Sequence, residues 1–323
     1  FRDGIHPQMR FVEAMFPDEA VKGESFAERV GRLEKRQEDI RKMMYRFCVS
    51  RLVRGDFSDW TGWEFRNEWA ISSYQPSITG KRWRLEKVSS LSVLGEQGIG
   101  DEVMYASCLN DIQCPVVVEC DPRIRSVLER AGYKTRSRSD VVDRNANKYL
   151  TTERPEEKFI PIGDLPRLFR KSLGDFPKRP YLTPLPEFVE KWSHLKGRTG
   201  VAWRSRTGQV KPRDLGIENP VSLQYDSWDY ETEGMEVPGC DLRNDIEDLL
   251  GICANLERVV SVPQTIVHLA GSIGTKVDVV MPPVGSSRVE NQIPWRYIDP
   301  MPWYSDARVY ANLGLYRRSR RKS

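Results

Sequence analysis

Apolar residues change their spacing along the chain, and this change divides it into parts. Over residues 25–54 they recur at roughly helical intervals, and Ser25 with Glu28 forms a capping box, so we predict one helix or a helical pair there. After residue 88, short apolar runs alternate with helical patterns. We predict strands over 88–94 and 116–120, and helices over 102–111 and 122–131. This order indicates a parallel sheet with helices on its faces.

The same alternation returns after the proline-rich stretch PYLTPLPE at 180–187. Strands are predicted over 199–203, 221–224, 259–262 and 277–281, and helices over 244–254 and 264–273. The charged stretch 137–158 between the two series is expected to be a surface loop. We therefore predict an α/β protein with two facing Rossmann-like domains behind an N-terminal helical extension.

The predicted boundaries follow these changes in pattern. They are 1–75 for the helical extension and a tryptophan-rich connector, 76–185 for the first Rossmann-like domain, 186–312 for the second, and 313–323 for a basic tail. Ligands of such sheets bind at the carboxyl ends of the strands. Chemistry is therefore expected in the loops at 95–101, 204–213 and 263–268.

The first of these loops lies in LGEQGIGDEVMYA, between a predicted strand and a predicted helix. Its glycines do not fit the G-x-G-x-x-G spacing, and no GK[ST] follows, so neither of these nucleotide-binding loops is present. Asp101 has two interpretations at this place. It can cap the helix and interact with the helix dipole, or it can face the cleft as a general base. The residue types alone leave both open.

The other two loops carry groups suited to an anion. Gln264 and Thr265 begin a predicted helix, whose free N–H groups can bind a phosphate, and His268 follows one turn later. The loop after Trp203 holds four cations, which are either solvated or placed opposite that helix to bind a diphosphate. They are Arg204, Arg206, Lys211 and Arg213.

Composition narrows the class of protein. The 323 residues are 39% hydrophobic and 30% charged, which is typical of a globular protein, and no run approaches the roughly 18 apolar residues of a membrane span. Of the 50 Lys and Arg residues, five lie in the tail YRRSRRKS, which leaves 45 against 46 acids elsewhere. We expect a solvated tail rather than a nucleic-acid contact. Six cysteines without a CxxC pair favour reduced thiols and a cytoplasmic location.

The triplet Glu119-Cys120-Asp121 follows a predicted strand and could hold a divalent metal ion through its two acids. Because Pro122 begins a helix immediately afterwards, Asp121 also suits the N-cap of that helix. We favour the cap.

A series of segments resembles one known family in the family's own order. They are LVRGDFSDWTGWEFRNEW, GEQGIGDEVMYA, IPIGDLPRLFRKSL, PYL, GVAWRS, VSLQYD, VVSVPQTIVHLAGSIG and PWRYIDPMPWYSDARVY. They resemble the glycosyltransferase-like domain that follows tetratricopeptide repeats in bacterial proteins. That domain is similar to the heptosyltransferases of glycosyltransferase family 9 and to other GT-B enzymes. The resemblance covers roughly residues 45–312.

The resemblance implies a GT-B fold whose second domain holds a nucleotide-sugar donor and whose first domain faces the acceptor. It implies Asp101 as the catalytic base, with no metal and no separate cofactor. The donor-binding residues that it implies, together with the loops above, are Arg204, Arg213, Gln264, Thr265 and His268. The acceptor-side loop that it implies consists of Glu96, Gln97, Gly98 and Gly100.

One departure from the family concerns the donor site. Where the family has Asp-Thr, this chain has Pro263-Gln264, so a carboxylate is absent there. We expect an inverting, metal-independent glycosyltransferase acting on a hydroxyl of a glycan or protein. The alternatives are a transferase acting on hydroxylated bases of phage-type DNA, a metal-dependent transferase using Glu119 and Asp121, and a non-catalytic binding or structural protein that retains the fold.

Overall fold

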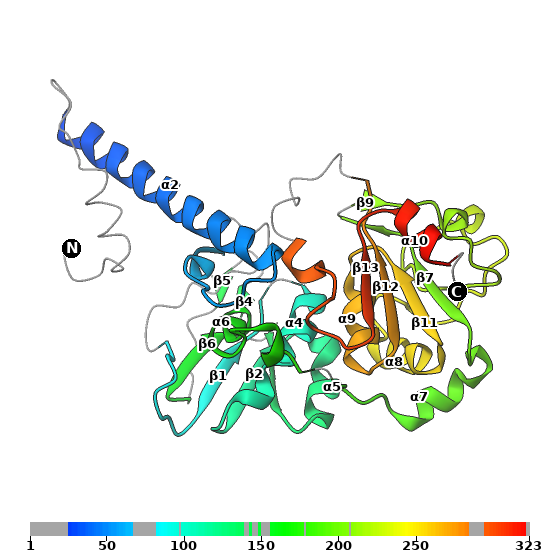
Figure 1. Ribbon diagram of the computed structural model, residues 1–323. Helices are drawn as coiled ribbons and strands as arrows, with labels where there is room; N and C mark the ends of the chain where they lie inside the picture. Colours follow the sequence, from blue (N-terminus) through cyan, green and yellow to red (C-terminus); the bar gives the residue numbers. More distant parts are fainter. Residues whose placement is uncertain are drawn as a thin grey trace.

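The computed structural model describes residues 25–66, 82–96, 98–138, 142–143, 148–149, 156–177, 179–206, 208–283 and 294–320. The predicted boundary at 75/76, Gln97 and residues 321–323 lie outside these ranges. Two separate parallel sheets form the body, side by side in Figure 1. The predicted boundary at 185/186 falls in the chain between them. No helix of the described residues is long and apolar enough to cross a membrane.

The N-terminal extension is one helix, α2 (Phe26–Val53), and not a helical pair. Its capping box is present as predicted, because the Ser25 hydroxyl accepts the Glu28 N–H while the Glu28 carboxylate accepts from Ser25. Figure 1 shows its first turns projecting from the body. The last turns pack into the main core through Tyr45, Cys48, Val49 and Leu52.

The first sheet has the order β3-β2-β1-β6, with all pairs parallel. Its strands are β1 (Leu91–Leu94), β2 (Val116–Cys120), β3 (Lys134–Ser137) and β6 (Lys158–Pro161). Its helices are α4 (Ile99–Ala106), α5 (Arg125–Arg130) and α6 (Leu165–Phe169). Strands β3 and β6 were not predicted, and the predicted loop at 137–158 overlaps each of them by one residue. The prediction also missed the hairpin pair β4 (Val142–Asp143) and β5 (Lys148–Tyr149) within that loop.

The second sheet has the order β10-β7-β11-β12-β13 and is also parallel. Its strands are β7 (Thr199–Ala202), β10 (Val221–Ser222), β11 (Arg258–Ser261), β12 (Lys276–Val280) and β13 (Ala307–Tyr310). Its helices are α7 (Pro186–Lys191), α8 (Ile246–Asn255) and α9 (Thr265–Ser272). A short hairpin, β8 (Arg204–Ser205) with β9 (Gly208–Gln209), extends the loop after β7.

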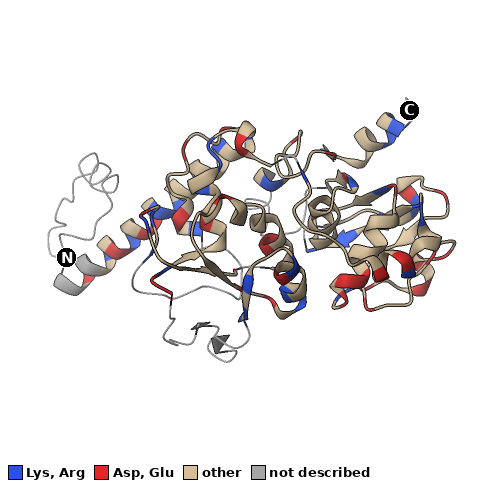
Figure 2. Ribbon diagram, turned by 90° about the horizontal axis from the view of Figure 1, so that it is seen from below, with Lys and Arg blue, Asp and Glu red and all other residues tan. Residues whose placement is uncertain are grey.

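The described part of the basic tail is a helix and not a frayed segment, although its arginines are exposed. Residues Leu313–Arg320 form helix α10, the last helix of Figure 2, where its arginines are blue. Tyr316 of this helix is fully buried in a small apolar cluster, and Arg317 Nη2 lies 2.9 Å from Asp214 Oδ1. The prediction missed the helix because the tail is mostly charged, and a single apolar residue, Tyr316, gives no helical periodicity.

An aromatic cluster joins the two halves. Trp60 and Trp63 of the connector pack against Trp295, with ring centroids 5.7 and 5.1 Å away. Trp295 belongs to the short helix η10 (Pro294–Tyr297), which returns from the second half and lies against α2, in orange in Figure 1. Buried aromatic rings in edge-to-face contact contribute strongly to packing. The tryptophan-rich connector therefore fixes residues 294–304 across the first half.

Candidate active site

A pocket of about 160 Å³ lies where the two halves meet. The loop after β1 leads into α4 on one side, and the loop after β11 leads into α9 on the other, so the carboxyl ends of both sheets supply it, as predicted. Its lining residues are Gly98, Gly100, Asp101, Pro263, Gln264, Thr265, His268, Arg296 and Tyr297. Two of the three predicted loops therefore meet here.

Gly100 lets the first turns of α4 and α9 approach closely. A Cβ atom at Gly100 would lie 3.1 Å from His268 Cδ2 and 3.2 Å from Thr265 Cα. Contacts this short are rarely tolerated, and one of them is to backbone. Because both helices present their N-terminal ends to the pocket, their free N–H groups and dipoles favour an anion there.

Asp101 caps its helix and also lines the pocket. Its Oδ2 accepts a hydrogen bond from the Gly98 backbone N–H at 3.4 Å, which caps the first turn of α4. Its Oδ1 lies 3.0 Å from Arg296 Nη2, and the side chain remains 24% exposed at the pocket. Asp101 is the one acid among the described residues that line this pocket. A carboxylate so placed can receive a proton from a bound hydroxyl group.

Gln264 is the N-cap of α9 but makes no capping hydrogen bond with its side chain. Its Nε2 atom is buried and has no hydrogen-bond partner. A buried amide donor without a partner is costly, which is typical of a position that a ligand completes. Pro263 beside it adds no charge. The α9 side of the pocket therefore offers donors and no carboxylate.

His268 lines the pocket as a neutral side chain and adds no positive charge to it. The ring is buried, with Nδ1 3.0 Å from the Tyr304 hydroxyl and Nε2 2.9 Å from the Tyr297 hydroxyl. Burial, and then the charge of Arg296, lowers the pKa of His268 to about 3. A neutral imidazole donates one of these hydrogen bonds and accepts the other. It orients Tyr297 at the pocket wall.

This depressed pKa makes stability depend on pH. In the unfolded chain His268 takes up a proton below its ordinary pKa, whereas the folded protein resists protonation until about pH 3, so its contribution is lost as pH falls through this window. We expect His268 alone to remove about 2 kcal/mol of stability between pH 7 and pH 5. Urea unfolding of the wild type and of His268→Gln at both pH values measures this. Equal losses in the two proteins would contradict it.

Arg204 and Arg213 do not line the pocket. Arg204 Nη1 lies 2.9 Å from Glu231 Oε1, and its other guanidinium nitrogen bonds the Asp226 carbonyl. Arg213 is exposed on the short helix η8 (Pro212–Leu215), which packs against α10. Their predicted role as donor-binding cations thus has no support from their position. The sequence showed a cluster of charges but not which acids would neutralise it.

A different arginine, Arg296, lines the pocket. It lies in the segment PWRYIDP, and its side chain is 9% exposed. Burial lowers the pKa of Arg296, but the neighbouring Asp101 and Tyr105 outweigh burial and hold the pKa above its ordinary value. The guanidinium therefore carries its charge at the pocket wall.

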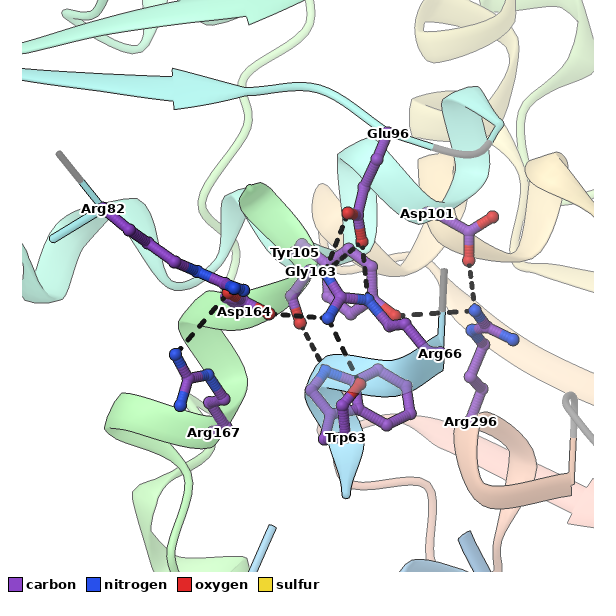
Figure 3. A network of polar contacts seen from close by, with 10 residues as sticks. All are labelled: Trp63, Arg66, Arg82, Glu96, Asp101, Tyr105, Gly163, Asp164, Arg167 and Arg296. Carbon is purple, nitrogen blue, oxygen red and sulfur yellow. Dashed lines mark hydrogen bonds and ion pairs between the residues drawn. The ribbon is translucent and has the colours of Figure 1, made fainter. Parts of the chain in front are cut away.

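Glu96 faces away from the pocket, unlike Gly98 and Gly100. It is fully buried, with Oε2 2.8 Å from Arg66 Nη2, and Arg66 Nη1 lies 2.6 Å from Asp164 Oδ1 (Figure 3). Asp164 also bonds Arg82 and lies 3.6 Å from Arg167. This ion-pair network ties the connector to the residue that starts the Asp101 loop. Glu96 therefore holds the loop to the buried ion-pair network and does not line the pocket.

The acids of the triplet at 119–121 are bound to arginines. Glu119 is fully buried, with Oε1 2.9 Å from Arg136 Nη1. Asp121 caps the helix η3 (Pro122–Ile124) and pairs with Arg123 at 2.9 Å, as the favoured interpretation required. Among the residues that the structure describes, no group of three or more His, Cys, Asp or Glu side chains could hold a metal ion. The geometry gives no support to a metal site at this triplet.

Comparison with known proteins gives distant similarities. No protein-family model matches the chain. It is 26% identical over 319 residues to Protein FlbA of Caulobacter vibrioides, a match covering 84% of this chain and 52% of FlbA. The chain thus spans about half the length of this curated relative.

Solved structures with a similar arrangement include glycosyltransferases. A glycosyl transferase family 9 protein from Veillonella parvula gives a TM-score of 0.46 at 9% identity, covering 71% of this chain and 88% of that one. The E. coli heptosyltransferase WaaC with ADP-2-deoxy-2-fluoro heptose gives 0.43 at 11% identity, covering 72% and 99%. These values are too low to transfer residue roles, so any role must come from the pocket itself.

Proposed function

We propose that the protein is a glycosyltransferase that moves a sugar from a nucleotide-sugar donor to an acceptor hydroxyl without a metal ion. The observation that carries the proposal is the pocket lined by residues 98–101 and 263–268, where a carboxylate faces a wall of hydrogen-bond donors and positive charge suited to an anion. The wall consists of the α9 N-terminus, the Gln264 amide and Arg296. The order of sequence motifs supports the same reaction class.

The chemistry divides between the two sides of this pocket. Asp101 takes the proton of the acceptor hydroxyl as its oxygen attacks the anomeric carbon of the donor sugar. The bond from that carbon to the diphosphate oxygen breaks, and its electron pair leaves with the diphosphate. Arg296 and the α9 N–H groups stabilise the developing negative charge. Attack opposite the leaving group inverts the anomeric configuration.

The pocket is small for a whole donor, since sites for drug-sized ligands usually exceed about 300 Å³. We therefore place the diphosphate and the anomeric carbon in it, with the nucleoside reaching beyond. The acceptor class proposed, a hydroxyl of a glycan or protein, is the one that the sequence resemblance implies. The DNA-base alternative rested on the arginine tail and the basic loops, and the pairing of Arg317 with Asp214 weakens the part of it that rested on the tail.

Calorimetric titration with ADP, GDP, UDP and CDP tests the donor site, and intact mass of candidate acceptors incubated with mixed nucleotide sugars tests transfer. We expect one nucleotide to bind and the acceptor mass to rise by one sugar residue. Binding without any mass increase would favour the non-catalytic alternative. Absence of binding by all four nucleotides would contradict the proposal.

A further inference from the structure

Arg296 and Asp101 form an ion pair that spans the two sides of the pocket. Asp101 belongs to α4 of the first half, whereas Arg296 arrives on η10 from the C-terminal segment. The Asp101 side chain is 24% exposed and the Arg296 side chain is 9% exposed, and both residues line the pocket. Figure 3 shows the Arg296 guanidinium directed at Asp101, with the Tyr105 hydroxyl 3.5 Å from Nη2.

This pairing conflicts with both roles that the pocket requires. A carboxylate held by an arginine is less available to a hydroxyl group, and an arginine held by a carboxylate is less available to a phosphate. A diphosphate in the pocket would face the α9 N-terminus, the Gln264 amide and the Arg296 guanidinium. Because a diphosphate carries more negative charge than Asp101, it competes with Asp101 for Arg296.

We propose that Arg296 is a diphosphate-binding residue that also controls the base: it pairs with Asp101 before the donor binds and moves to the diphosphate when the donor arrives. The inference rests on the proposed function for the identity of the ligand. Arg296 lies about 30 positions beyond the α9 loop in the sequence, far from the motif that carries Asp101. Donor binding thereby exposes Asp101 to the acceptor, and loss of the diphosphate product restores the pair.

The backbone around Arg296 is fixed on both sides, so the exchange of anions needs only a movement of the Arg296 side chain. Arg296 is flanked by Trp295, which is fixed in the aromatic cluster, and by Tyr297, whose hydroxyl contacts His268. The backbone of η10 is thus held on both sides of Arg296. A rotation of the long arginine side chain, without movement of the two halves, is enough to exchange one anion for another.

Titration with inorganic pyrophosphate tests the exchange, because this probe has no sugar or nucleoside and does not depend on transfer. We expect Arg296→Gln to weaken pyrophosphate binding about 100-fold, and Arg296→Lys to weaken it less, since lysine keeps the charge but not the forked geometry. We expect Asp101→Asn to bind pyrophosphate about tenfold more tightly, because the competing carboxylate is gone. The matched control is Arg258→Gln, which breaks a 2.6 Å ion pair with Asp278 at the opposite end of β11 and should leave binding unchanged.

The sign of the Asp101→Asn effect separates this role from a structural one. If Arg296 and Asp101 only held the pocket together, removing either would weaken binding, so weaker or unchanged binding in Asp101→Asn overturns the inference. No pyrophosphate binding by the folded wild type at millimolar concentration also overturns it. Transfer activity reports separately on the proposed function: normal transfer with unaltered pyrophosphate binding by Arg296→Gln would leave the function standing and remove this role.

Discussion

Asp101→Asn is expected to lower the rate of sugar transfer by about 10² to 10⁴-fold, the usual contribution of a general base. The amide oxygen of asparagine can still accept the Gly98 N–H, so the first turn of α4 keeps its cap. The amide cannot take the acceptor proton. The loss should therefore appear in kcat, while KM for the donor does not rise.

Steady-state rates measured with the nucleotide sugar found by mass analysis check this expectation. The matched control is Asp214→Asn, which removes a carboxylate from an exposed pair with Arg317 and should keep the wild-type rate. Thermal melting of all three proteins shows whether each variant is folded. Transfer by Asp101→Asn at the wild-type rate would mean that another group takes the proton.

Local patterns in the sequence were sufficient for most of the fold. The strand Val116–Cys120 was predicted residue for residue, because a short apolar run ends at a proline-started helix. The capping box at Ser25 also marked the start of α2 correctly, because its two partners, Ser25 and Glu28, lie within one turn of the chain. Strand β13 was not predicted although three of its four residues, ARVY, are apolar, because periodicity cannot assign so short a run.

The candidate site was harder to predict because its parts lie far apart in the sequence. Asp101 and Gln264 each follow a strand, and the rule that ligands bind at carboxyl ends brought their loops together. Arg296 follows no predicted strand. It reaches the pocket because Trp295 packs on the connector tryptophans, a tertiary contact that no local pattern encodes. The arginines at 204–213 were chosen for their charge and for their place after a predicted strand, but Glu231 and Asp226 neutralise Arg204.

Glu96 shows how the same limit affects buried charges. Glu96 was predicted to belong to the acceptor-side loop because it lies in the glycine-rich segment. In the structure it forms an ion pair with Arg66, 30 residues earlier in the chain. Taking a carboxylate and a guanidinium out of water is costly unless both are paired and hydrogen-bonded. The close fit around that pair is therefore a sensitive point of the structure, and it depends on Gly163.

Gly163→Ala is expected to destabilise the protein by about 3 kcal/mol or more, the usual cost of disrupting a buried ion pair. A Cβ atom there would lie 1.8 Å from Glu96 Oε1 and 3.1 Å from Arg66 Nε. The carboxylate cannot move aside without losing Arg66, because both side chains are buried. The Gly163 carbonyl also accepts the Trp63 indole N–H at 2.6 Å, so the backbone cannot withdraw without breaking that bond.

Urea unfolding at pH 7 measures this loss, with Gly239→Ala as the matched control. A Cβ at Gly239 has no neighbour within 4 Å, so that variant should unfold within about 0.5 kcal/mol of the wild type. Because Glu96 starts the loop that carries Asp101, Gly163→Ala should also reduce transfer at temperatures where it remains folded. A wild-type midpoint for Gly163→Ala would show that the carboxylate can be rearranged at little cost, and the network would then not be what holds the Asp101 loop.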